Sequence, residues 1–311
     1  MPLIFPLLPQ SRATSIVCIG ELLWDLLPSG PQLGGAPSNL AVHLAALGAQ
    51  SVLISRVGAD DRGREALRRL AARGVNISGV SSDDQLPTGT VGVTVDALGQ
   101  PEFNIHSPVA WDALEATDTV RCLTQSAGVL CFGTLAQRNP RSRHAIQTLR
   151  NDAAESQLIV CDINLRAPFY NLSLIENSLE GIHILKLNET ELPLLNALFG
   201  LGTTVQAQVE SLAARFKINT VILTLGKAGS RLWRQGHWFI EAGRTVHVRD
   251  SVGAGDAFTA ACILGFIKNW SEPEILSRAS DIASYVCTQP GATPEIPADL
   301  TPSFRAIPAN S

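Results

Sequence analysis

Short apolar runs alternate with amphipathic segments along most of the chain. The runs are rich in Val, Ile and Leu and occupy residues 15–20, 51–58, 128–133, 157–164, 182–188 and 219–226. Segments with a helical spacing of apolar residues lie at 37–48, 61–74, around 144–150, from Glu189 onward and at 257–267. Near-continuous apolar strands are typical of a sheet that is buried on both faces. The pattern therefore predicts an α/β fold, with a doubly wound, mostly parallel sheet and helices on both faces.

Two segments depart from this alternation. Residues 88–96 and 101–106 place apolar and polar residues in turn and are joined by residues 97–100, which predicts a hairpin outside the main repeat. Residues 231–242 predict a second hairpin.

The first of these hairpins sets the expected domain organisation. We expect a single domain over residues 14–300, with a small β-lid formed by about 22–33 and 86–112 inserted in it. Residues 1–13 and 301–311 are expected to be tails.

Composition and charge exclude several classes of protein. The chain has 311 residues, 45 % of them hydrophobic and 17 % charged, which is ample material for a core. The net charge is −4 and the Lys and Arg residues form no run, which argues against a nucleic-acid partner. No apolar run reaches the roughly 18 residues of a membrane span. Six widely spaced cysteines without a C-x-x-C pair indicate reduced thiols, so we expect a cytoplasmic protein.

Polar and small residues gather directly after the apolar runs. In a parallel sheet, ligands bind at the carboxyl ends of the strands, so these positions are the candidates for a site. They are Glu21 and Asp25, Gly34 and Gly35, Asp162 with Asn164 and Arg166, Asn188 with Glu191, Thr224 with Gly226 and Gly229, and residues 250–256.

The last of these segments, DSVGAGD, precedes a convincing helix. Its small residues would expose backbone N–H groups at the positive end of the helix, which suits a bound anion. A carboxylate in the first turn, Asp256, is unfavourable beside a phosphate but suits a base that takes a proton from an attacking hydroxyl. The structural alternative is an ordinary capping or first-turn aspartate.

Two further segments carry candidate ligands. Asn188 and Glu191 lie one helical turn apart, where they would hold a hydrated Mg²⁺ through water; the alternative is an Asn cap with an acidic first turn. Asp162, Asn164 and Arg166 alternate with apolar residues and therefore project to one side of a strand end. Arg166 suits a phosphate or sugar oxygen, although a surface ion pair is its more common role.

The segment before the first helix suits a sugar. Gly34 and Gly35 allow the backbone to approach a ligand closely, and Asn39 offers a donor and an acceptor to a hydroxyl. Asp25 is a hydroxyl acceptor, and Trp24 beside it offers an apolar face. The alternatives are a tight turn, a loop Asp and a core Trp.

Several familiar site motifs are absent from the sequence. There is no G-x-x-x-x-G-K-[ST] motif, and Phe258 occupies the position where a dinucleotide-binding fingerprint needs Gly or Ala. No H-E-x-x-H motif, clustered Cys/His set or G-x-S-x-G elbow is present either. The sequence thus argues against a P-loop NTPase, a dinucleotide dehydrogenase, a transition-metal site and an α/β-hydrolase.

Together these motifs resemble the ribokinase-like, PfkB-type carbohydrate kinases. The similarity extends from about Ile16 to Pro297, and the order and spacing of the motifs carry it. GGAPSNLAVHLAALG with VGADDRG resembles the N-terminal signature of the family, NETE its N-x-x-E element and DSVGAGD its C-terminal signature. TLGKAGS resembles the nucleotide-binding turn, and QPGATPEIP the stretch that follows the signature.

The resemblance implies an α/β/α domain with a small β-lid, and it implies a role for each residue of the site. Asp256 is implied as the catalytic base, with a backbone cradle for the transferred group at Gly253, Ala254 and Gly255. ATP would lie near Asn188, Thr224, Gly226, Gly229 and Gly255, and Asn188 with Glu191 would organise Mg²⁺. The sugar would contact Asp25, Gly34, Gly35, Asn39, Asp162, Asn164 and Arg166. Relatives commonly bind K⁺ at the positions of Asp250 and the Val252 carbonyl.

The choice of sugar depends on finer similarities. GELLWDLLP with GGAPSN, DINLR and PVAWD looks most like fructokinases, whereas Leu23 and the pair Ala36 and Pro37 depart from ribokinases. We therefore expect an ATP-dependent kinase that makes fructose 6-phosphate, with a homodimer formed through the lid. The alternatives are a kinase for 2-keto-3-deoxygluconate, for a nucleoside, or for a phosphosugar held by Arg138, Arg141 and Arg143. From a different class, the alternative is a non-catalytic sugar- or nucleotide-sensing protein.

Overall fold

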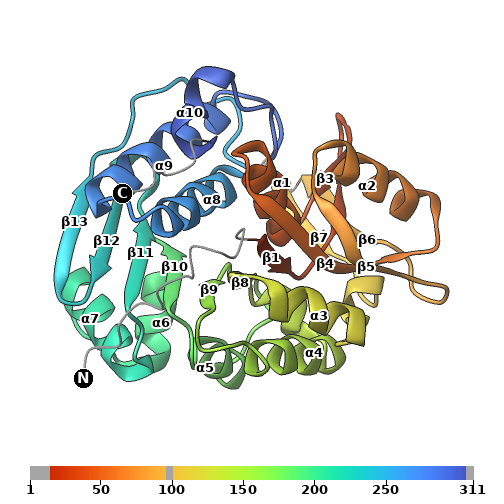
Figure 1. The fold of residues 1–311 in the computed structure, drawn as a ribbon, viewed down its shortest axis with the longest axis horizontal. Helices are drawn as coiled ribbons and strands as arrows, with labels where there is room; N and C mark the ends of the chain where they lie inside the picture. The colour runs from red at the N-terminus through yellow and green to blue at the C-terminus, as the bar shows by residue number, and fades with distance from the viewer. Residues whose placement is uncertain (1–14, 96–100, 306–311) are drawn as a thin grey trace.

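A computed structural model describes residues 15–95 and 101–305 of the chain (Figure 1). Within them, nine strands form one sheet in the order β13-β12-β11-β10-β9-β8-β1-β4-β5. The strands are β1 (Ser15–Ile19), β4 (Gln50–Gly58), β5 (Asn76–Asp83), β8 (Val129–Phe132), β9 (Leu158–Asp162), β10 (Ile184–Asn188), β11 (Thr220–Thr224), β12 (Ser230–Arg234) and β13 (His237–Glu241). All neighbours are parallel except β11–β12 and β12–β13. The predicted doubly wound α/β fold is therefore confirmed.

Helices cover both faces of this sheet, and each face has its own apolar core. In Figure 1, α8, α9 and α10 lie above the sheet and α3 to α7 below it. The upper layer contains α1 (Ala36–Ala46), α2 (Asp61–Ala72), α8 (Ala254–Ile267), α9 (Glu272–Cys287) and α10 (Pro302–Arg305). The lower layer contains α3 (Asp118–Ser126), α4 (Pro140–Asn151), α5 (Leu172–Leu179), α6 (Glu191–Phe199) and α7 (Val205–Phe216). The two cores explain why the strands are apolar at nearly every position.

A second, smaller sheet lies beside the N-terminal part of the first. Its order is β3-β2-β6-β7, built from β2 (Leu23–Leu27), β3 (Gly30–Gly34), β6 (Gly89–Val95) and β7 (Pro101–Ile105). β2 and β6 pair in parallel, and the other two pairs are antiparallel. This sheet occupies the segments expected to form a lid; the turn expected at 97–100 lies outside the described residues.

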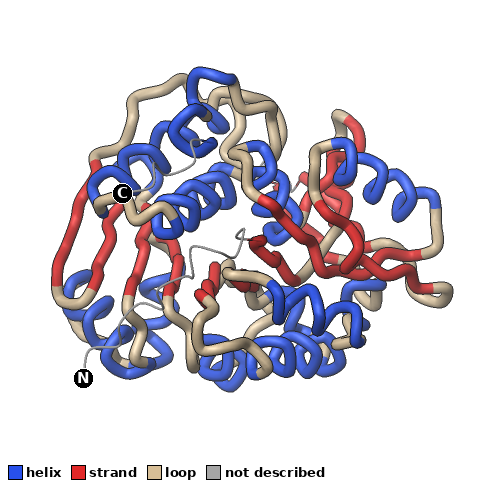
Figure 2. Tube along the Cα trace, viewed as in Figure 1, coloured by secondary structure: helices blue, strands red, loops and turns tan. Residues whose placement is uncertain are grey.

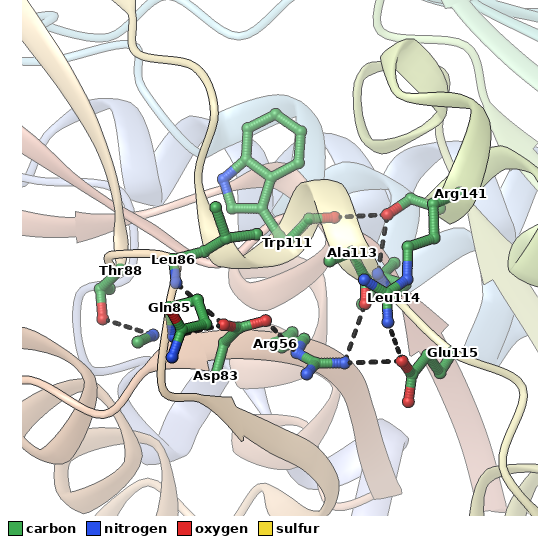
Figure 3. A network of polar contacts seen from close by, with 12 residues as sticks. Arg56, Asp83, Gln85, Leu86, Thr88, Trp111, Ala113, Leu114, Glu115 and Arg141 are labelled. Atoms are coloured by element: carbon green, nitrogen blue, oxygen red, sulfur yellow. Dashed lines mark hydrogen bonds and ion pairs between the residues drawn. The ribbon is translucent and has the colours of Figure 1, made fainter.

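The two ends of the β6–β7 segment of the small sheet are attached to the main domain at one place (Figure 3). Arg56, near the end of β4, pairs with Asp83 at 2.9 Å and donates to the Ala113 carbonyl at 3.0 Å. Asp83 in turn accepts from the backbone N–H groups of Gln85 and Leu86, both at 2.8 Å, where the chain leaves β5 for β6. One arginine thus links the outgoing and the returning segments of the lid.

Some elements differ from the sequence prediction. The helix expected from Glu189 begins at Glu191, because the Asn188 side chain accepts from the Glu191 N–H at 3.0 Å and fixes the first turn there. β5, α3, α7 and α9 were not predicted. Residues 301–305 were expected to be part of a tail, yet Phe304 is buried and stacks edge-on against Trp270. Contact with the α8–α9 layer therefore orders this segment.

Candidate active site

The loops that follow β1, β8, β9, β10 and β11 open at one edge of the sheet, because these strands are parallel (Figure 2). A cavity at this edge is lined by Glu21, Asp162, Asn164, Asp256 and Thr259, together with Pro37, Leu40 and residues 131–135. Five polar side chains from three distant parts of the sequence thus share one cavity. Glu21 follows β1, Asp162 and Asn164 lie at the end of β9, and Asp256 and Thr259 come from α8.

Asp256 is hydrogen-bonded to a residue that is expected to bind the sugar. Its Oδ2 accepts a hydrogen bond from Asn39 Nδ2 at 2.9 Å, across 217 positions of sequence. The pKa of Asp256 is raised to about 7, chiefly by burial and then by the negative charge of Asp162, while the Asn39 hydrogen bond and Lys186 act in the opposite direction. A carboxyl with such a pKa exchanges protons near neutral pH, as a general base must.

The turn before α8 leaves backbone N–H groups available. Gly253 stands at the N-cap with φ 79°, and no side chain caps the helix. A Cβ on Gly253 would lie 2.0 Å from the Ala292 carbonyl oxygen, so only glycine fits. The helix start that the sequence predicts is therefore present, and no side chain caps its first N–H groups, which is the arrangement that anion binding requires.

Alanine at Gly253 would meet both backbone strain and a steric clash, and a second glycine allows the two effects to be measured separately. Gly236 has a similar backbone (φ 90°) but open space around a Cβ, so Gly236→Ala is a matched control. We expect Gly253→Ala to lower the free energy of unfolding by about 1–3 kcal/mol more than Gly236→Ala, as overpacking typically does. Urea unfolding of both variants measures the difference, and equal losses would contradict the close packing.

Lys186 is a member of this cluster that the sequence analysis missed. Its ammonium lies 3.1 Å from Asp162 Oδ2, and Thr259 Oγ1 donates to the same carboxylate oxygen at 3.1 Å. The ammonium is also 3.2 Å from the position that a Cβ on Gly255 would take, which places it beside the Gly-rich turn. The pKa of Lys186 is raised despite burial, because Asp162, Glu191 and Asp256 surround it, so the positive charge persists at neutral pH.

Glu21, a candidate from its place after a strand to which the sequence assigned no role, also lies in this cavity. Its side chain is buried, and its Oε2 has no hydrogen-bond partner among the described residues. Burial raises its pKa to about 7, although Arg166 and Arg138 lower it. An unpartnered buried carboxyl oxygen in a cavity beside Asp256 is available to a ligand hydroxyl.

The expected sugar residues surround the turn into α1. Asp25 Oδ2 would lie 2.3 Å from a Cβ on Gly34, and a Cβ on Gly35 would lie 2.4 Å from the Glu21 carbonyl oxygen, so both glycines are required by close packing. Burial raises the pKa of Asp25 to about 6, and the positive charge of Arg166 opposes the shift. Asn164, with φ 41°, lines the cavity.

Trp24 does not offer its face to this cavity. It is 3 % exposed, its Nε1 donates to the Arg62 carbonyl at 3.1 Å, and the Arg69 guanidinium stacks on its ring. The core alternative raised by the sequence is therefore the correct one for this residue.

Asn188, Glu191 and Thr224 meet where β10 and β11 end. Asn188 and Thr224 are opposite each other in the strand register. The Glu191 carboxylate accepts from the N–H groups of Leu165 and Asn188, both at 2.8 Å, and Asn188 Oδ1 accepts from Thr190 and Glu191. Both side chains therefore hold the local backbone, which leaves them able to contact a metal through water rather than as its main ligands. In the described part of the chain, no group of three or more His, Cys, Asp or Glu forms a metal cluster.

Asp250 braces the Gly-rich turn from the other side. Its Oδ1 accepts from the Val252 N–H and its Oδ2 from the Gly291 N–H, both at 3.0 Å. The Val252 side chain is half exposed. The pair expected near a monovalent cation is thus part of a well-defined turn.

The three arginines considered for a phosphosugar form no common cluster. Arg138 is buried in an ion pair with Asp112 at 2.8 Å, Arg141 pairs with Glu115, and Arg143 donates to the Gln137 carbonyl at 2.9 Å. Each has its own partner, which weakens this alternative.

Comparison with known proteins agrees with this geometry. A family model described as pfkB family carbohydrate kinase matches residues 30–299. A sugar kinase from Pyrococcus horikoshii, described as uncharacterized, is 30 % identical over 271 residues, which cover 81 % of this chain and 83 % of that protein. Its crystal structure in complex with ATP superposes with a TM-score of 0.75 at 28 % identity, covering 89 % of this chain and 93 % of that one.

A fructokinase from Escherichia coli is 28 % identical over 257 residues, which cover 79 % of this chain and 82 % of that protein. No helix in the described ranges combines the length and hydropathy that a bilayer crossing needs. Because the family model spans most of the chain, this protein belongs to the pfkB family of carbohydrate kinases and is a phosphotransferase that acts on a sugar hydroxyl.

Proposed function

We propose that this kinase transfers the γ-phosphoryl group of ATP to a primary hydroxyl of a ketohexose and converts fructose to fructose 6-phosphate. The observation that carries the proposal is the hydrogen bond between Asn39 and Asp256, which joins the segment expected to bind the sugar to the Gly-rich helix start. The similarity to a fructokinase and to an ATP-bound sugar kinase supports this pair of substrates.

Asp256 is the general base of this proposal. It takes the proton of the attacking hydroxyl, while the N–H groups at Gly253, Ala254 and Gly255 stabilise the charge on the transferred group. Asp25, Gly34, Gly35, Asn39, Asn164 and Arg166 hold the sugar, and Asp162 acts chiefly through Lys186 and Thr259. Closure of the lid over the sugar excludes water, which otherwise competes as the acceptor.

The nucleotide is assigned to the neighbouring strand ends. Asn188, Thr224, Gly226, Gly229 and Gly255 line its expected position. When bound, Mg²⁺ neutralises charge on the phosphates, and it keeps most of its ligands from water and phosphate. Asn188 and Glu191 suit that arrangement, because their side chains are already held by backbone hydrogen bonds and reach a metal only through water.

The test measures ADP release with Mg-ATP and K⁺. The acceptors are fructose, ribose, 2-keto-3-deoxygluconate, tagatose 6-phosphate and adenosine, and the control is the Asp256→Asn protein. Turnover on fructose that is lost in the variant is the expected result. Preference for another acceptor would overturn fructose, and binding of ATP and sugar without ADP release would favour the sensing protein.

The Glu21→Gln variant tests the electrostatics of the base. The negative charge of Glu21 raises the pKa of Asp256, so its removal should lower that pKa. Because Asp256 acts as the carboxylate, the acidic limb of kcat/KM should move to lower pH, by less than about one pH unit. The exposed Glu155→Gln is the control, and an unmoved or upward-shifted limb would contradict the coupling.

Activation by K⁺ is a further part of the proposal. The paired turn of Asp250 and Val252 retains free lone pairs on its carboxylate and carbonyl oxygens for a monovalent cation. We expect higher activity in K⁺ than in a K⁺-free buffer of equal ionic strength, and equal rates would contradict a K⁺ site at this turn.

A homodimer through the lid completes the proposal. The small sheet carries alternating apolar residues, so one of its faces needs a cover, and a partner lid is the cover that we propose. Light scattering at micromolar concentration should give a dimer, and a monomer would count against this arrangement.

A further inference from the structure

A second cleft lies apart from the candidate active site and shares no lining residue with its cavity. It has a volume of about 340 Å³, within the usual range for small-molecule sites. Its walls come from β3, α1, α2 and the loop after α9, and the lining residues are Gln32, Leu33, Val42, Arg68, Arg69, Leu70, Ala72, Arg73 and residues 290–293. The cleft therefore lies where the lid meets the main domain.

The charge of this cleft is strongly positive for an acidic protein. Three arginines line it and no carboxylate does, although the whole chain carries a net charge of −4. Glu65, which does not line the cleft, pairs with both Arg68 and Arg69 at 2.7 Å and neutralises one of the three charges. Two positive charges remain, which matches a dianion such as a phosphate monoester near neutral pH.

The side chains of Arg69 and Arg73 are held in place by contacts with the protein. Arg69 stacks on the buried ring of Trp24, with 4.8 Å between the guanidinium carbon and the ring centroid. Arg73 donates to the carbonyls of Thr293 and Pro294 at 2.8 and 3.2 Å. Fixed guanidinium groups lose less entropy on binding an oxyanion than freely moving side chains do.

The rest of the cleft suits a neutral portion of the ligand. Leu33, Val42 and Leu70 supply apolar surface, and the Gln32 amide supplies polar contacts. The volume is several times the roughly 30 Å³ of a water molecule, so a phosphate group alone would leave much of the cleft unfilled. We propose that this cleft binds a small phosphate monoester, at a site separate from the site of phosphoryl transfer.

Such a ligand would contact the loop that braces the Gly-rich turn. Gly291 donates to Asp250, and the Ala292 carbonyl accepts from His43 at 3.0 Å and packs against Gly253. Gln32 of β3 lies over Gly291, 3.0 Å from where its Cβ would be. An occupant would therefore touch both the lid and the support of the anion-binding turn.

Calorimetric titration with glycerol 3-phosphate, inorganic phosphate and glycerol tests the site. The cleft variant is Arg68→Gln with Arg69→Gln, two exposed side chains whose loss should not unfold the protein. The matched control is Arg62→Gln with Arg64→Gln, which removes two arginines from the same helix outside the cleft.

We expect one glycerol 3-phosphate per chain, with affinity reduced at least about tenfold in the cleft variant and changed less than about twofold in the control. Inorganic phosphate should bind more weakly than the ester, and glycerol should not bind. The proposal is overturned by equal affinities in the two double variants, by absence of binding, or by inorganic phosphate binding as tightly as the ester. None of these outcomes depends on which sugar the kinase phosphorylates.

Discussion

Asp256→Asn should keep the fold and lose turnover by roughly 10² or more, the scale typical of removing a general base. The amide is nearly isosteric with the carboxyl and can still meet Asn39, whose Nδ2 lies 2.9 Å from Asp256 Oδ2. It cannot accept the proton of the sugar hydroxyl. Steady-state kinetics with the sugar and ATP at saturation measures the loss in kcat, and near-normal turnover would overturn the assigned role.

The same variant should also be more stable above neutral pH. The pKa of Asp256 is about 7 in the folded protein against 3.8 ordinarily, so the folded state binds a proton that the unfolded state has released. Stability therefore falls as the pH rises from about 4 to 7, and above pH 7 the buried charge is fully unfavourable. Because one pKa unit corresponds to about 1.4 kcal/mol, the asparagine should gain a few kcal/mol at pH 8 and almost nothing at pH 4.

Wild-type activity should reflect this titration. Since the base acts as the carboxylate, kcat/KM should fall about tenfold for each pH unit below 7. Urea unfolding of wild type and variant at both pH values, together with the pH profile, distinguishes a base from a structural carboxyl. A variant that is less stable at pH 8 would show that burial of the charge carries no penalty.

Lys186→Met should have the second largest effect. It leaves the largely buried Asp162 carboxylate without the ammonium that lies 3.1 Å away, and losses of this kind cost up to about 3–5 kcal/mol when both groups are fully buried. Turnover should fall by about 10² or more as well, because the ammonium stands beside the anion-binding turn.

A double variant separates these two consequences. Lys186→Met with Asp162→Asn removes both charges, so most of the stability should return in urea unfolding. The Thr259 hydroxyl can still bond to the amide oxygen, as it now does to the carboxylate at 3.1 Å. Turnover should remain low, because nothing replaces the positive charge. Recovery of both properties together would show that Lys186 only keeps Asp162 in place.

Local patterns in the sequence predicted much of the fold. Val, Ile and Leu runs such as residues 51–58 report burial on both faces, and Pro37 and Gly48 mark the ends of one helix. α9 (Glu272–Cys287) was not recognised, because its buried side includes Ala279 and Ser280, which carry little apolar signal in the sequence. Tertiary contact also explains Phe304, whose burial depends on Trp270.

The candidate site was predictable only where its residues follow a local rule. Asp162, Asn188 and Thr224 stand at strand ends, and Asp256 opens a helix. Lys186 lies inside a strand, its partner Asp162 comes from β9, and the charge of Asp256 comes from α8, so no neighbouring residue in the sequence indicates its role. The environment of Glu21 likewise arises only when the turn into α1 packs over it.

The attachment of the lid through Arg56 has an evolutionary consequence. Because both ends of the β6–β7 segment meet one guanidinium near the end of β4, this half of the small sheet has a single, defined attachment to the main domain, whereas β2 and β3 join it separately through residues 20–22 and 35. Substitutions in the β6–β7 segment can then accumulate while the junction and the Gly-rich turn stay constant. Descendants of such an enzyme would diversify by remodelling this one segment, and protein engineers can use the same junction to graft it between relatives.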